Sequence, residues 1–402
     1  MSYKAIFALA AAYDWEIEQM DVKTAFLYGD IDEDIWIELP TGCGVSRTAK
    51  LRKALYGLKQ SPRVWYNTLA TFLASLDFKP LDADSSVFCR DGTIIAIYVD
   101  DLLLAGASKA DIDRIKAALS ERFKMSDLGA CHFYLGMEVI RDRPRRTLRL
   151  SQKAYIEKVL QDHGFGSYKP VTTPMETSSR LVPADQNHQA DQTLRRKYQS
   201  IVGSLMYAML GTRPDLAFAV SVVSRFSSNP DKTHMRAVER ILRYLHDTAD
   251  MGLVFRGTLQ PLSGYTDSDW AGDPDTRRLT SGYVFSLGSA AISWSSKRQP
   301  TVSLCTCEAE YIGQTNATKE AIWLQGFLKQ IDPGDPGLGA TIIYGDNQGA
   351  IALAKNDQFH GRVKHIDIQH HFVREKLVEG RINLRYVPIL EQVANELIKA
   401  LY

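Results

Sequence analysis

The stretch IIAIYVDDLLLAG at residues 94–106 constrains this chain more than any other part of its sequence. Two adjacent aspartates, Asp100 and Asp101, stand between a six-residue apolar run and a run of three leucines. Burying even one unpaired carboxylate costs several kcal/mol, so a pair in this setting needs a compensating partner. Two short β-rich runs on either side of the pair predict a β-hairpin with the carboxylates at its turn.

A third carboxylate is expected near this hairpin. Residues 15–21, WEIEQMD, alternate roughly between apolar and polar side chains, which predicts a half-buried strand that ends at Asp21. If this strand and the hairpin are neighbours, three carboxylates meet at one edge of a sheet. Such hard oxygen ligands favour Mg²⁺, and two Mg²⁺ ions support nucleotidyl transfer. For the aspartate pair taken alone, a surface hairpin turn is the alternative.

Composition limits the classes of function. The chain has 402 residues, enough for two or three domains, and its formal net charge of +1 gives no overall basic field. A nucleic-acid partner would therefore need a local basic patch. The five cysteines include no C-x-x-C pair, which argues against a disulfide scaffold or a structural zinc site and favours a reduced compartment.

The first residues, MSYKAIFALAAAY, superficially resemble a signal peptide because Lys4 precedes an apolar stretch. A short helix packed on the core is the interpretation we favour, since an acidic, strand-like segment follows at once. No segment reaches the roughly 20 apolar residues of a membrane span. We expect a soluble chain that is cytoplasmic or nuclear and is not secreted.

The remaining pattern predicts alternating elements in three blocks. Helices are expected from the Ser61-Pro62 start signal and after Ser108, followed by a strand, a basic turn and a strand over residues 131–151. Residues 167–197 form the best linker, and 198–247 a helical block. From residue 262 onward we expect three strands, a helix, a strand, two helices, a strand and a last helix.

Several motifs of the first block resemble the reverse transcriptase of copia-type retrotransposons. The segments QMDVKTAFLYGDI, LYGLKQSPRVWY, YVDDLLLAG and FYLGMEV occur in the order and spacing of that enzyme's palm, and residues 198–256 resemble its connecting region. The resemblance implies that the metal ligands are Asp21, Asp100 and Asp101. It also implies substrate contacts for Phe26, beneath the sugar, for Gln60, near the incoming nucleotide, and for Tyr98.

The last block resembles the ribonuclease H domain of the same elements, through GYTDSDWAGD, CEAEYIG, YGDNQGAI and HGRVKHIDIQHHFVRE. This resemblance implies a second Mg²⁺ site, and its ligands by position are Asp267, Glu310 and Asp346. Asp269 stays open as an alternative for the first acid. The second is Glu310 rather than Glu308, because the helix acid of that family directly precedes the bulky residue at Tyr311. Mn²⁺ could replace Mg²⁺ at either site.

The fourth acid of that family is missing. Where the family has an aspartate in its last helix, this chain reads EQVANEL, with Asn395 at the position. An amide offers an oxygen but no charge, so we expect weaker metal binding and strongly reduced RNA cleavage. Glu396 would point about 100° away on a helix, which makes rescue by it doubtful. A zinc or other metal role is not expected for the histidines His360, His365, His370 and His371, which lack partner cysteines and a ligand spacing.

The predicted fold is a multidomain α+β and α/β chain. Residues 1–165 would form a reverse transcriptase palm, 166–260 a linker with thumb or connection helices, and 261–402 a ribonuclease H-like βββαβαβα domain. In this family the fingers lie upstream of the first aspartate, and only 20 residues precede Asp21, so we expect them to be largely missing. Five arginines at residues 141–149 could contact phosphates or form a solvated basic hairpin.

The implied partners are an RNA template, a DNA primer, an RNA–DNA hybrid and deoxynucleoside triphosphates, in the cytoplasm within a virus-like particle or in the nucleus. No membrane contact is expected, and the sequence leaves the oligomeric state open. Two alternatives to an active polymerase remain. One is a non-catalytic remnant that still binds nucleic acid, and the other is a metal-dependent nuclease that uses only the last domain.

Overall fold

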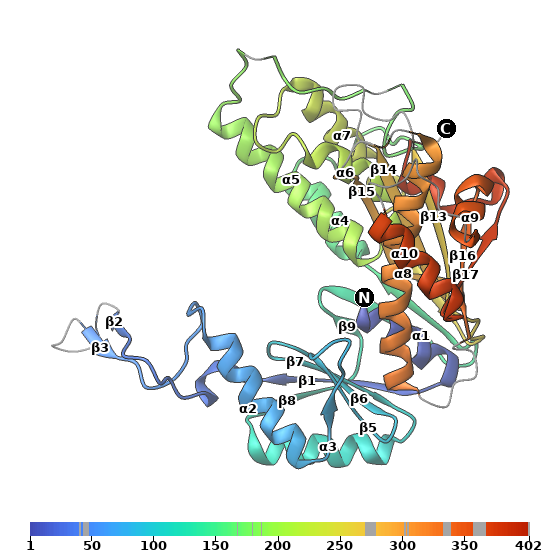
Figure 1. Cartoon of the computed structure of the whole chain (residues 1–402). Helices are drawn as coiled ribbons and strands as arrows, with labels where there is room; N and C mark the ends of the chain where they lie inside the picture. The colour runs from blue at the N-terminus through green and yellow to red at the C-terminus, as the bar shows by residue number, and fades with distance from the viewer. Residues whose placement is uncertain are drawn as a thin grey trace.

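A computed structural model of the chain describes all residues except 40–41, 43–47, 167, 179, 186, 270–278, 301–302, 304, 333–338, 357–366 and 401–402. Figure 1 shows three regions: a sheet with α2 and α3 at the bottom, the helices α4–α7 at the upper left, and a second large sheet at the right. Within the described residues, no helix is both long and apolar enough to cross a membrane.

The hairpin predicted around Asp100 lies in the middle of a six-stranded sheet with the order β4-β5-β6-β7-β1-β8, in which all neighbours are antiparallel. Its strands are β1 (Glu16–Val22), β4 (Lys79–Pro80), β5 (Val87–Arg90), β6 (Thr93–Tyr98), β7 (Asp101–Gly106) and β8 (Met125–Ala130). A separate ribbon pairs β2 (Trp36–Glu38) with β3 (Thr48–Lys50), and a 3₁₀ turn, η1, covers Ala25–Tyr28.

Helices cover both faces of this sheet, which explains why the hairpin strands are continuously apolar. Leu102 and Leu104 pack in the same cluster as α2 (Ser61–Ser75) and α3 (Lys109–Arg122). Leu103 and Ala105 point the other way and pack in the cluster of α1 (Ser2–Tyr13). Successive strand residues alternate between faces, so a strand covered on both sides has no polar face. The helices expected after residues 61 and 108 are both confirmed.

A second, four-stranded sheet connects the first block to the helices. Its order is β12-β11-β10-β9, with β9 (Phe133–Tyr134), β10 (Met137–Asp142), β11 (Thr147–Ser151) and β12 (Gly252–Arg256). The strand, basic turn and strand expected over 131–151 are therefore present. Because β12 pairs with β11, the chain returns to this sheet after its helical block. The division at residues 165 and 260 stays a prediction.

The helical block contains α4 (Lys153–Asp162), α5 (Gln192–Gly211), η2 (Pro214–Leu216), α6 (Ala217–Ser224) and α7 (Lys232–Asp247), which share one core cluster. Side-chain caps set two of the starts, since Asp191 accepts a bond from the Leu194 amide and Asp231 accepts bonds from the first turn of α7. Helix α5 thus begins six residues before residue 198, where the helical block was predicted to start.

The third region has the strand order β15-β14-β13-β16-β17, antiparallel from β15 to β13 and parallel from β13 to β17. The strands are β13 (Ser263–Asp269), β14 (Thr280–Leu287), β15 (Ala290–Arg298), β16 (Thr341–Gly345) and β17 (Ile382–Tyr386). Helices α8 (Thr306–Ile331), α9 (Gln348–Lys355) and α10 (Asp367–Val378) accompany them. The expected element order is observed through β17.

The predicted last helix is wrong for the described residues. Two 3₁₀ turns, η4 (Ile389–Glu391) and η5 (Val393–Leu397), take its place. The buried Gln392 side chain donates to the Thr266 carbonyl and accepts a bond from the Ala394 amide, so it ties the start of η5 to β13. The amides of Asn395 and Ile398 then bond three residues back, which is the 3₁₀ pattern.

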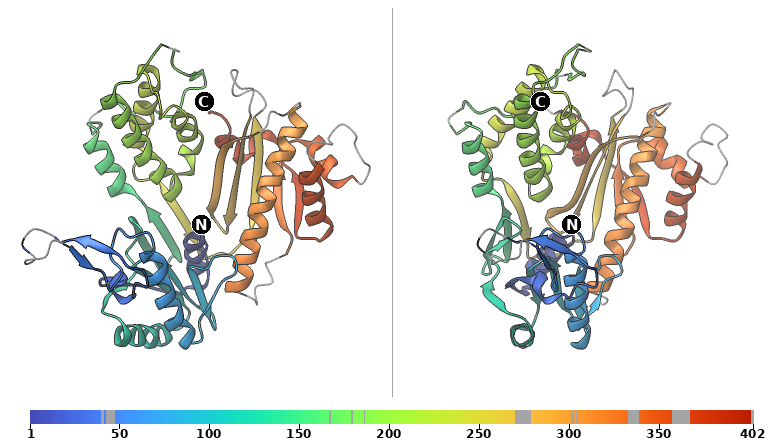
Figure 2. Two further views of the ribbon diagram at one scale, coloured as in Figure 1. Left: turned by 60° about the vertical axis from the view of Figure 1, so that its left-hand side comes forward. Right: turned by 90° about the vertical axis from the view of Figure 1, so that its left-hand side faces the viewer.

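The N-terminal helix α1 lies where the three regions meet, as Figure 2 shows from two sides. It packs against β7, β11, β12 and β15. The buried Lys4 ammonium donates to the Leu210 carbonyl at 2.8 Å and lies 3.6 Å from the centroid of the Trp294 ring. The short helix expected here instead of a signal peptide is confirmed, and it joins the regions to one another.

Candidate functional site

The turn that carries Asp100 is held from both sides. Strands β6 and β7 pair up to Tyr98 opposite Asp101, leaving Val99 and Asp100 as the turn. Val99 has a φ of 58°, in the left-handed region that is costly for a β-branched residue. The buried Trp65 indole of α2 donates to the Val99 carbonyl at 2.6 Å and so stabilises this conformation.

Strand pairing brings the third carboxylate to the hairpin. Asp21 of β1 lies directly opposite Asp101 of β7. All three carboxyl residues are neither fully buried nor fully exposed. Burial, together with the Asp100 charge, raises the pKa of Asp21. Burial likewise raises the pKa of Asp101, against a hydrogen bond from Gln19 that lowers it. Partial desolvation beside like charges is the condition that a bound cation would relieve.

Neutral side chains donate hydrogen bonds to two of these carboxylates. The Gln19 amide Nε2 donates to Asp101 Oδ1 at 3.2 Å, and the Tyr56 hydroxyl donates to Asp100 Oδ2 at 3.3 Å. Across the described ranges, the acids of the hairpin and β1 are not among the groups whose ligand atoms all lie within 4.8 Å of one another. The hairpin site is therefore an open arrangement of carboxylates, each with a free oxygen.

Of the predicted substrate contacts, Phe26 lies beside this site and Gln60 does not contact it. The buried Phe26 ring is 4.4 Å from the ring of the exposed Tyr56, centroid to centroid. Gln60 precedes α2 and donates to Glu33 at 3.3 Å, away from the carboxylates. Tyr98 is 57% exposed on the strand next to the turn. Tyr56 lies beside the acids, and the nucleotide contact of Gln60 stays a prediction.

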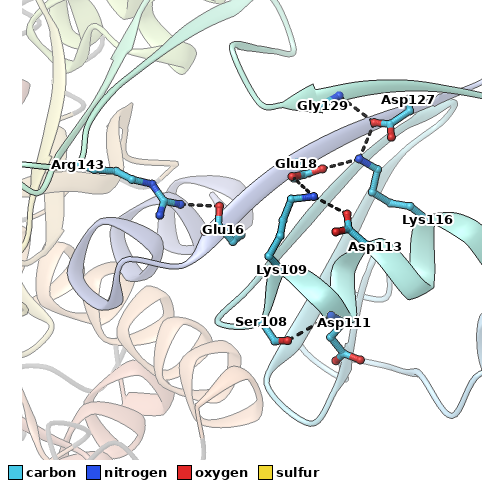
Figure 3. Close-up of polar contacts among 10 residues, drawn as sticks. All are labelled: Glu16, Glu18, Ser108, Lys109, Asp111, Asp113, Lys116, Asp127, Gly129 and Arg143. Atoms are coloured by element: carbon cyan, nitrogen blue, oxygen red, sulfur yellow. Dashed lines mark hydrogen bonds and ion pairs between the residues drawn. The ribbon is translucent and has the colours of Figure 1, made fainter.

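A buried ion-pair network, drawn in Figure 3, fixes the strand that ends at Asp21. Glu18 of β1 pairs with Lys109, at 2.8 Å, and with Lys116, both on α3. Lys116 also pairs with Asp127 of β8 at 2.6 Å. Helix α3 is thereby tied to two neighbouring strands three residues from the Asp21 carboxylate. Breaking a buried pair leaves an uncompensated charge, so this network resists displacement of β1.

The third region brings together a tighter set of acids. Asp267 of β13, Glu310 of α8 and Asp346, which follows β16, have ligand oxygens within 4.8 Å of one another. Asp267 and Glu310 are nearly fully buried. Burial raises the pKa of Glu310, and the Asp267 charge adds to this rise. Burial, then the Asp346 charge, raises the pKa of Asp267.

Three buried oxygen acceptors in this region have no hydrogen-bond donor: Asp267 Oδ2, Gln314 Oε1 and Asn395 Oδ1. Gln314 follows Glu310 by one turn of α8, and its amide lies near Gly345, which precedes Asp346. Buried acceptors without donors are rare in folded proteins. Oxygen donors of this kind, with two or more carboxylates, fit a divalent cation of the Mg²⁺ class.

The alternatives for this cluster differ in position. Asp269 and Glu308 are not part of the group of acids that lie within 4.8 Å. Asn395 donates through Nδ2 to the Ile389 carbonyl at 2.9 Å. Glu396 lines a separate cavity with Asp215 and Tyr244.

Of the four histidines for which no metal role was expected, His360, His365 and the side chain of His370 lie outside the described residues.

Comparison with known proteins identifies the family. Residues 1–177 match the family described as reverse transcriptase (RNA-dependent DNA polymerase). The retrovirus-related Pol polyprotein from transposon TNT 1-94 of Nicotiana tabacum is 43% identical over 99% of this chain. The putative transposon Ty5-1 protein of Saccharomyces cerevisiae is 35% identical over 75% of this chain and the whole of that protein. The chain belongs to the copia-type retrotransposon reverse transcriptase family.

Most of a full-length relative has no counterpart in this chain. It spans 31% of the tobacco polyprotein and 27% of the related polyprotein from transposon RE1 of Arabidopsis thaliana, to which it is 38% identical. Among solved structures, the foamy viral protease-reverse transcriptase in complex with dsDNA superposes with a TM-score of 0.51. That alignment covers 96% of this chain and 71% of the viral one at 15% identity, so it reports a shared fold.

Three residues that contact the hairpin carboxylates or their turn were not predicted from the sequence, namely Gln19, Tyr56 and Trp65. A signal for Gln19 was available, because Glu18 and Gln19 are consecutive polar residues that break the alternation of apolar and polar side chains in this strand. Both are buried, one in the ion-pair network and the other against Asp101. No comparable signal marks Tyr56, whose contact with Asp100 spans 44 residues of sequence.

Proposed function

We propose that this chain is an RNA-directed DNA polymerase, joined to a ribonuclease H-like unit of the same retrotransposon polyprotein. The observation that carries the proposal is the pairing of Asp21 with Asp101 at the end of a rigid hairpin. It places three carboxylates, a buried aromatic ring and an exposed tyrosine at one edge of a sheet. Family membership supports the same conclusion.

At the polymerase site, Asp21, Asp100 and Asp101 would hold Mg²⁺, or Mn²⁺ in its place. Bound there, the metal supplies activation of the primer hydroxyl and charge stabilisation at the departing pyrophosphate. The chain's own residues do the positioning. Gln19 and Tyr56 orient the hairpin carboxylates, Trp65 fixes the turn between them, and the Phe26 ring forms the floor on which the nucleotide sugar rests.

The substrates we propose are an RNA template, a DNA primer and deoxynucleoside triphosphates at the polymerase site. An RNA–DNA hybrid would be the substrate at the second site, where Asp267, Glu310 and Asp346 would hold Mg²⁺. Asn395 brings an oxygen without a charge to this cluster, so we propose that RNA hydrolysis is strongly reduced. Glu396 does not compensate, because it lines a different cavity.

A second candidate function is a non-catalytic form that binds nucleic acid without turnover. Asn395 favours it at the ribonuclease H-like site. At the hairpin, Gln19 and Tyr56 bond to two of the carboxylates. These bonds favour the non-catalytic form only if a bound cation does not draw the carboxylates together. The stand-alone nuclease is the least supported alternative, because it depends on the site that lacks a fourth acid.

Primer extension on a poly(A) template with Mg²⁺ tests the proposal. We expect extension by the chain and its loss, by at least about a thousandfold, in the Asp100→Asn, Asp101→Asn double variant. Asp91→Asn with Asp162→Asn is the matched control, since it removes the same charge from two exposed carboxylates that lie outside β1 and the hairpin. No extension by either protein, with salt-dependent binding of a hybrid retained, would establish the non-catalytic alternative.

A further inference from the structure

A cavity of about 420 Å³ lies on the face of α7 that the segment from Phe165 to Leu181 covers. Three arginines of α7 line it, Arg236, Arg240 and Arg243. Their spacing of four and three residues places them on one side of the helix. This surface is not the part of the helical block that meets the four-stranded sheet. That contact is made by α5, whose Tyr207 hydroxyl donates to the Leu135 carbonyl in the turn between β9 and β10.

The guanidinium groups in this cavity retain unused donors. Arg236 is exposed and has neither a hydrogen bond nor an ion pair within the described part of the chain. Arg243 uses Nε for the Lys169 carbonyl, which leaves its two terminal nitrogens available. Arg240 is engaged by Glu176 and Thr173. Seven residues of helix separate Arg236 from Arg243, about 10 Å, so the two free groups can contact successive anionic groups of one ligand.

Acidic residues reduce the charge of the cavity without cancelling it. Glu176 and Glu239 line it beside the three arginines, so one positive charge remains. Glu176 is paired with Arg240 and is 57% exposed. An anionic ligand can therefore displace Glu176 from Arg240 into solvent without leaving a buried charge unpaired.

An aromatic platform adjoins these arginines. The rings of Phe165 and Tyr168 stack with centroids 4.4 Å apart and planes 25° apart. Phe165 is buried, whereas Tyr168 is 51% exposed, so one face of the tyrosine ring is open. His246 contacts the Gly166 carbonyl at 3.2 Å and holds the intervening chain to α7. Open aromatic faces beside guanidinium groups are typical of sites that stack bases and track a phosphate backbone.

We propose that this groove binds a single-stranded stretch of nucleic acid, with phosphates on Arg236 and Arg243 and a base on Tyr168. It is a second nucleic-acid site, separate from the hairpin carboxylates. This inference rests on the proposed function in one respect, the choice of nucleic acid as the anionic ligand. An acidic peptide would use the same charges but would gain little from the open ring of Tyr168.

The test measures binding of a fluorescein-labelled 12-nucleotide RNA to the full chain by anisotropy, without divalent metal, over a range of salt concentrations. The Arg236→Ala, Arg243→Ala variant removes two proposed phosphate contacts. We expect binding at least about tenfold weaker, with the slope of log K against log salt smaller by about 1.4, that is 0.7 for each contact to a single strand. Tyr168→Ala should weaken binding about fivefold or more.

The matched control is Arg196→Ala, Lys197→Ala, which removes the same charge from exposed residues of α5 that do not line the cavity. Equal effects of the two double variants would overturn the proposal. Competition by poly-glutamate as strong as that by poly(U) would also overturn it, in favour of an acidic peptide. Arg236→Glu alone provides the same comparison if the double variant fails to fold, because this exposed side chain has no partner to lose among the described residues.

Failure of this proposal can be told apart from failure of the proposed function. Binding in the groove requires no carboxylate, so the Asp100→Asn, Asp101→Asn variant should bind the RNA normally even though it does not extend a primer. The chain could extend primers while the Arg236→Ala, Arg243→Ala variant binds RNA as well as the control variant of α5. That result would support the polymerase assignment and overturn the second nucleic-acid site.

Discussion

The two acidic sites of this chain contain similar residues and hold them in opposite ways. At the hairpin, half-exposed carboxylates accept hydrogen bonds from neutral donors, Asp101 from Gln19 and Asp100 from Tyr56. In the third region, Asp267 and Glu310 are buried with Asp346 and converge within 4.8 Å. An open site tolerates ionised carboxylates because water and donors solvate them, whereas a closed site requires a proton or a cation.

This difference teaches what each site lacks. On the proposed assignment, the hairpin carries its three acids, and the third region carries three acids with the amide of Asn395 in place of a fourth. Among the described residues, Asp267 Oδ2, Gln314 Oε1 and Asn395 Oδ1 are buried without donors, which fits a cation site of smaller negative charge.

The largest effect is expected from restoring the fourth acid. Asn395→Asp should raise Mg²⁺-dependent cleavage of an RNA–DNA hybrid at least about tenfold, the lower end of the effect of removing a group near a metal. The measurement is hybrid cleavage at limiting Mg²⁺. Glu396→Asp is the control, because that side chain faces Asp215 and should leave the rate unchanged. An unchanged rate in Asn395→Asp would mean that the charge at this position does not limit the site.

A smaller effect is expected at the open site. Gln19→Leu removes the donor to Asp101 while keeping a similar volume, and one hydrogen bond to a charged group contributes about 1.5–3 kcal/mol. We expect the Mg²⁺ concentration for half-maximal primer extension to change by about threefold or more, with overall folding intact. Gln199→Leu, at an exposed residue of α5, should not alter it. Identical metal dependence in both variants would remove Gln19 from the positioning of Asp101.

The burial contrast predicts opposite responses of stability to loss of charge. In EDTA at pH 7, Glu310→Gln should stabilise the chain by about 1 kcal/mol or more, the equivalent of one pKa unit. Burial raises the pKa of Glu310 to about 10, so folding at pH 7 has to protonate this carboxyl, and glutamine removes that cost. Asp101→Asn should not stabilise the chain, since that carboxylate is half-exposed and already has a donor. Thermal unfolding followed by circular dichroism provides the comparison, and a lower Tm for Glu310→Gln would contradict it.

The smallest effect concerns pH. Since the folded state raises the pKa of Asp267 and Glu310, it binds more protons than the unfolded chain once pH exceeds about 4. Stability of the metal-free protein should therefore fall as pH rises above that value. Mg²⁺ replaces those protons, so its effect on Tm should be larger at pH 8 than at pH 5. An effect of Mg²⁺ that is independent of pH would argue that the closed site is not where it binds.

The sequence predicted the parts of the molecule that are determined locally. Apolar runs on either side of Asp100 and Asp101 were enough to predict the hairpin. Ser108 was enough to predict the start of α3, since its hydroxyl accepts a hydrogen bond from the Asp111 amide at 3.2 Å. The last helix was wrong because a distant contact, from Gln392 to the Thr266 carbonyl, determines the backbone there. Local propensity carries no record of a partner 126 residues away.

The site was predicted at the level of its acids and less well at the level of their neighbours. Asp267, Glu310 and Asp346 lie together as the resemblance implied, although their catalytic roles stay predictions. The nucleotide contact of Gln60 stays a prediction, whereas Tyr56, which packs on Phe26 and donates to Asp100, had no signal in the sequence. A motif fixes residue types and spacing, but which member of a loop faces the site depends on how the loop packs.

Mn²⁺ binding followed by electron paramagnetic resonance tests the central claim most directly, that one chain holds an open, complete cation site and a closed, incomplete one. We expect two classes of Mn²⁺ sites in the full chain. The Asp100→Asn, Asp101→Asn variant should remove one class of Mn²⁺ sites. The Asp267→Asn, Glu310→Gln variant should remove the other class. Asn395→Asp should increase the Mn²⁺ affinity of this second class only. Two classes that survive both pairs of substitutions, or tightening of the hairpin class by Asn395→Asp, would contradict it.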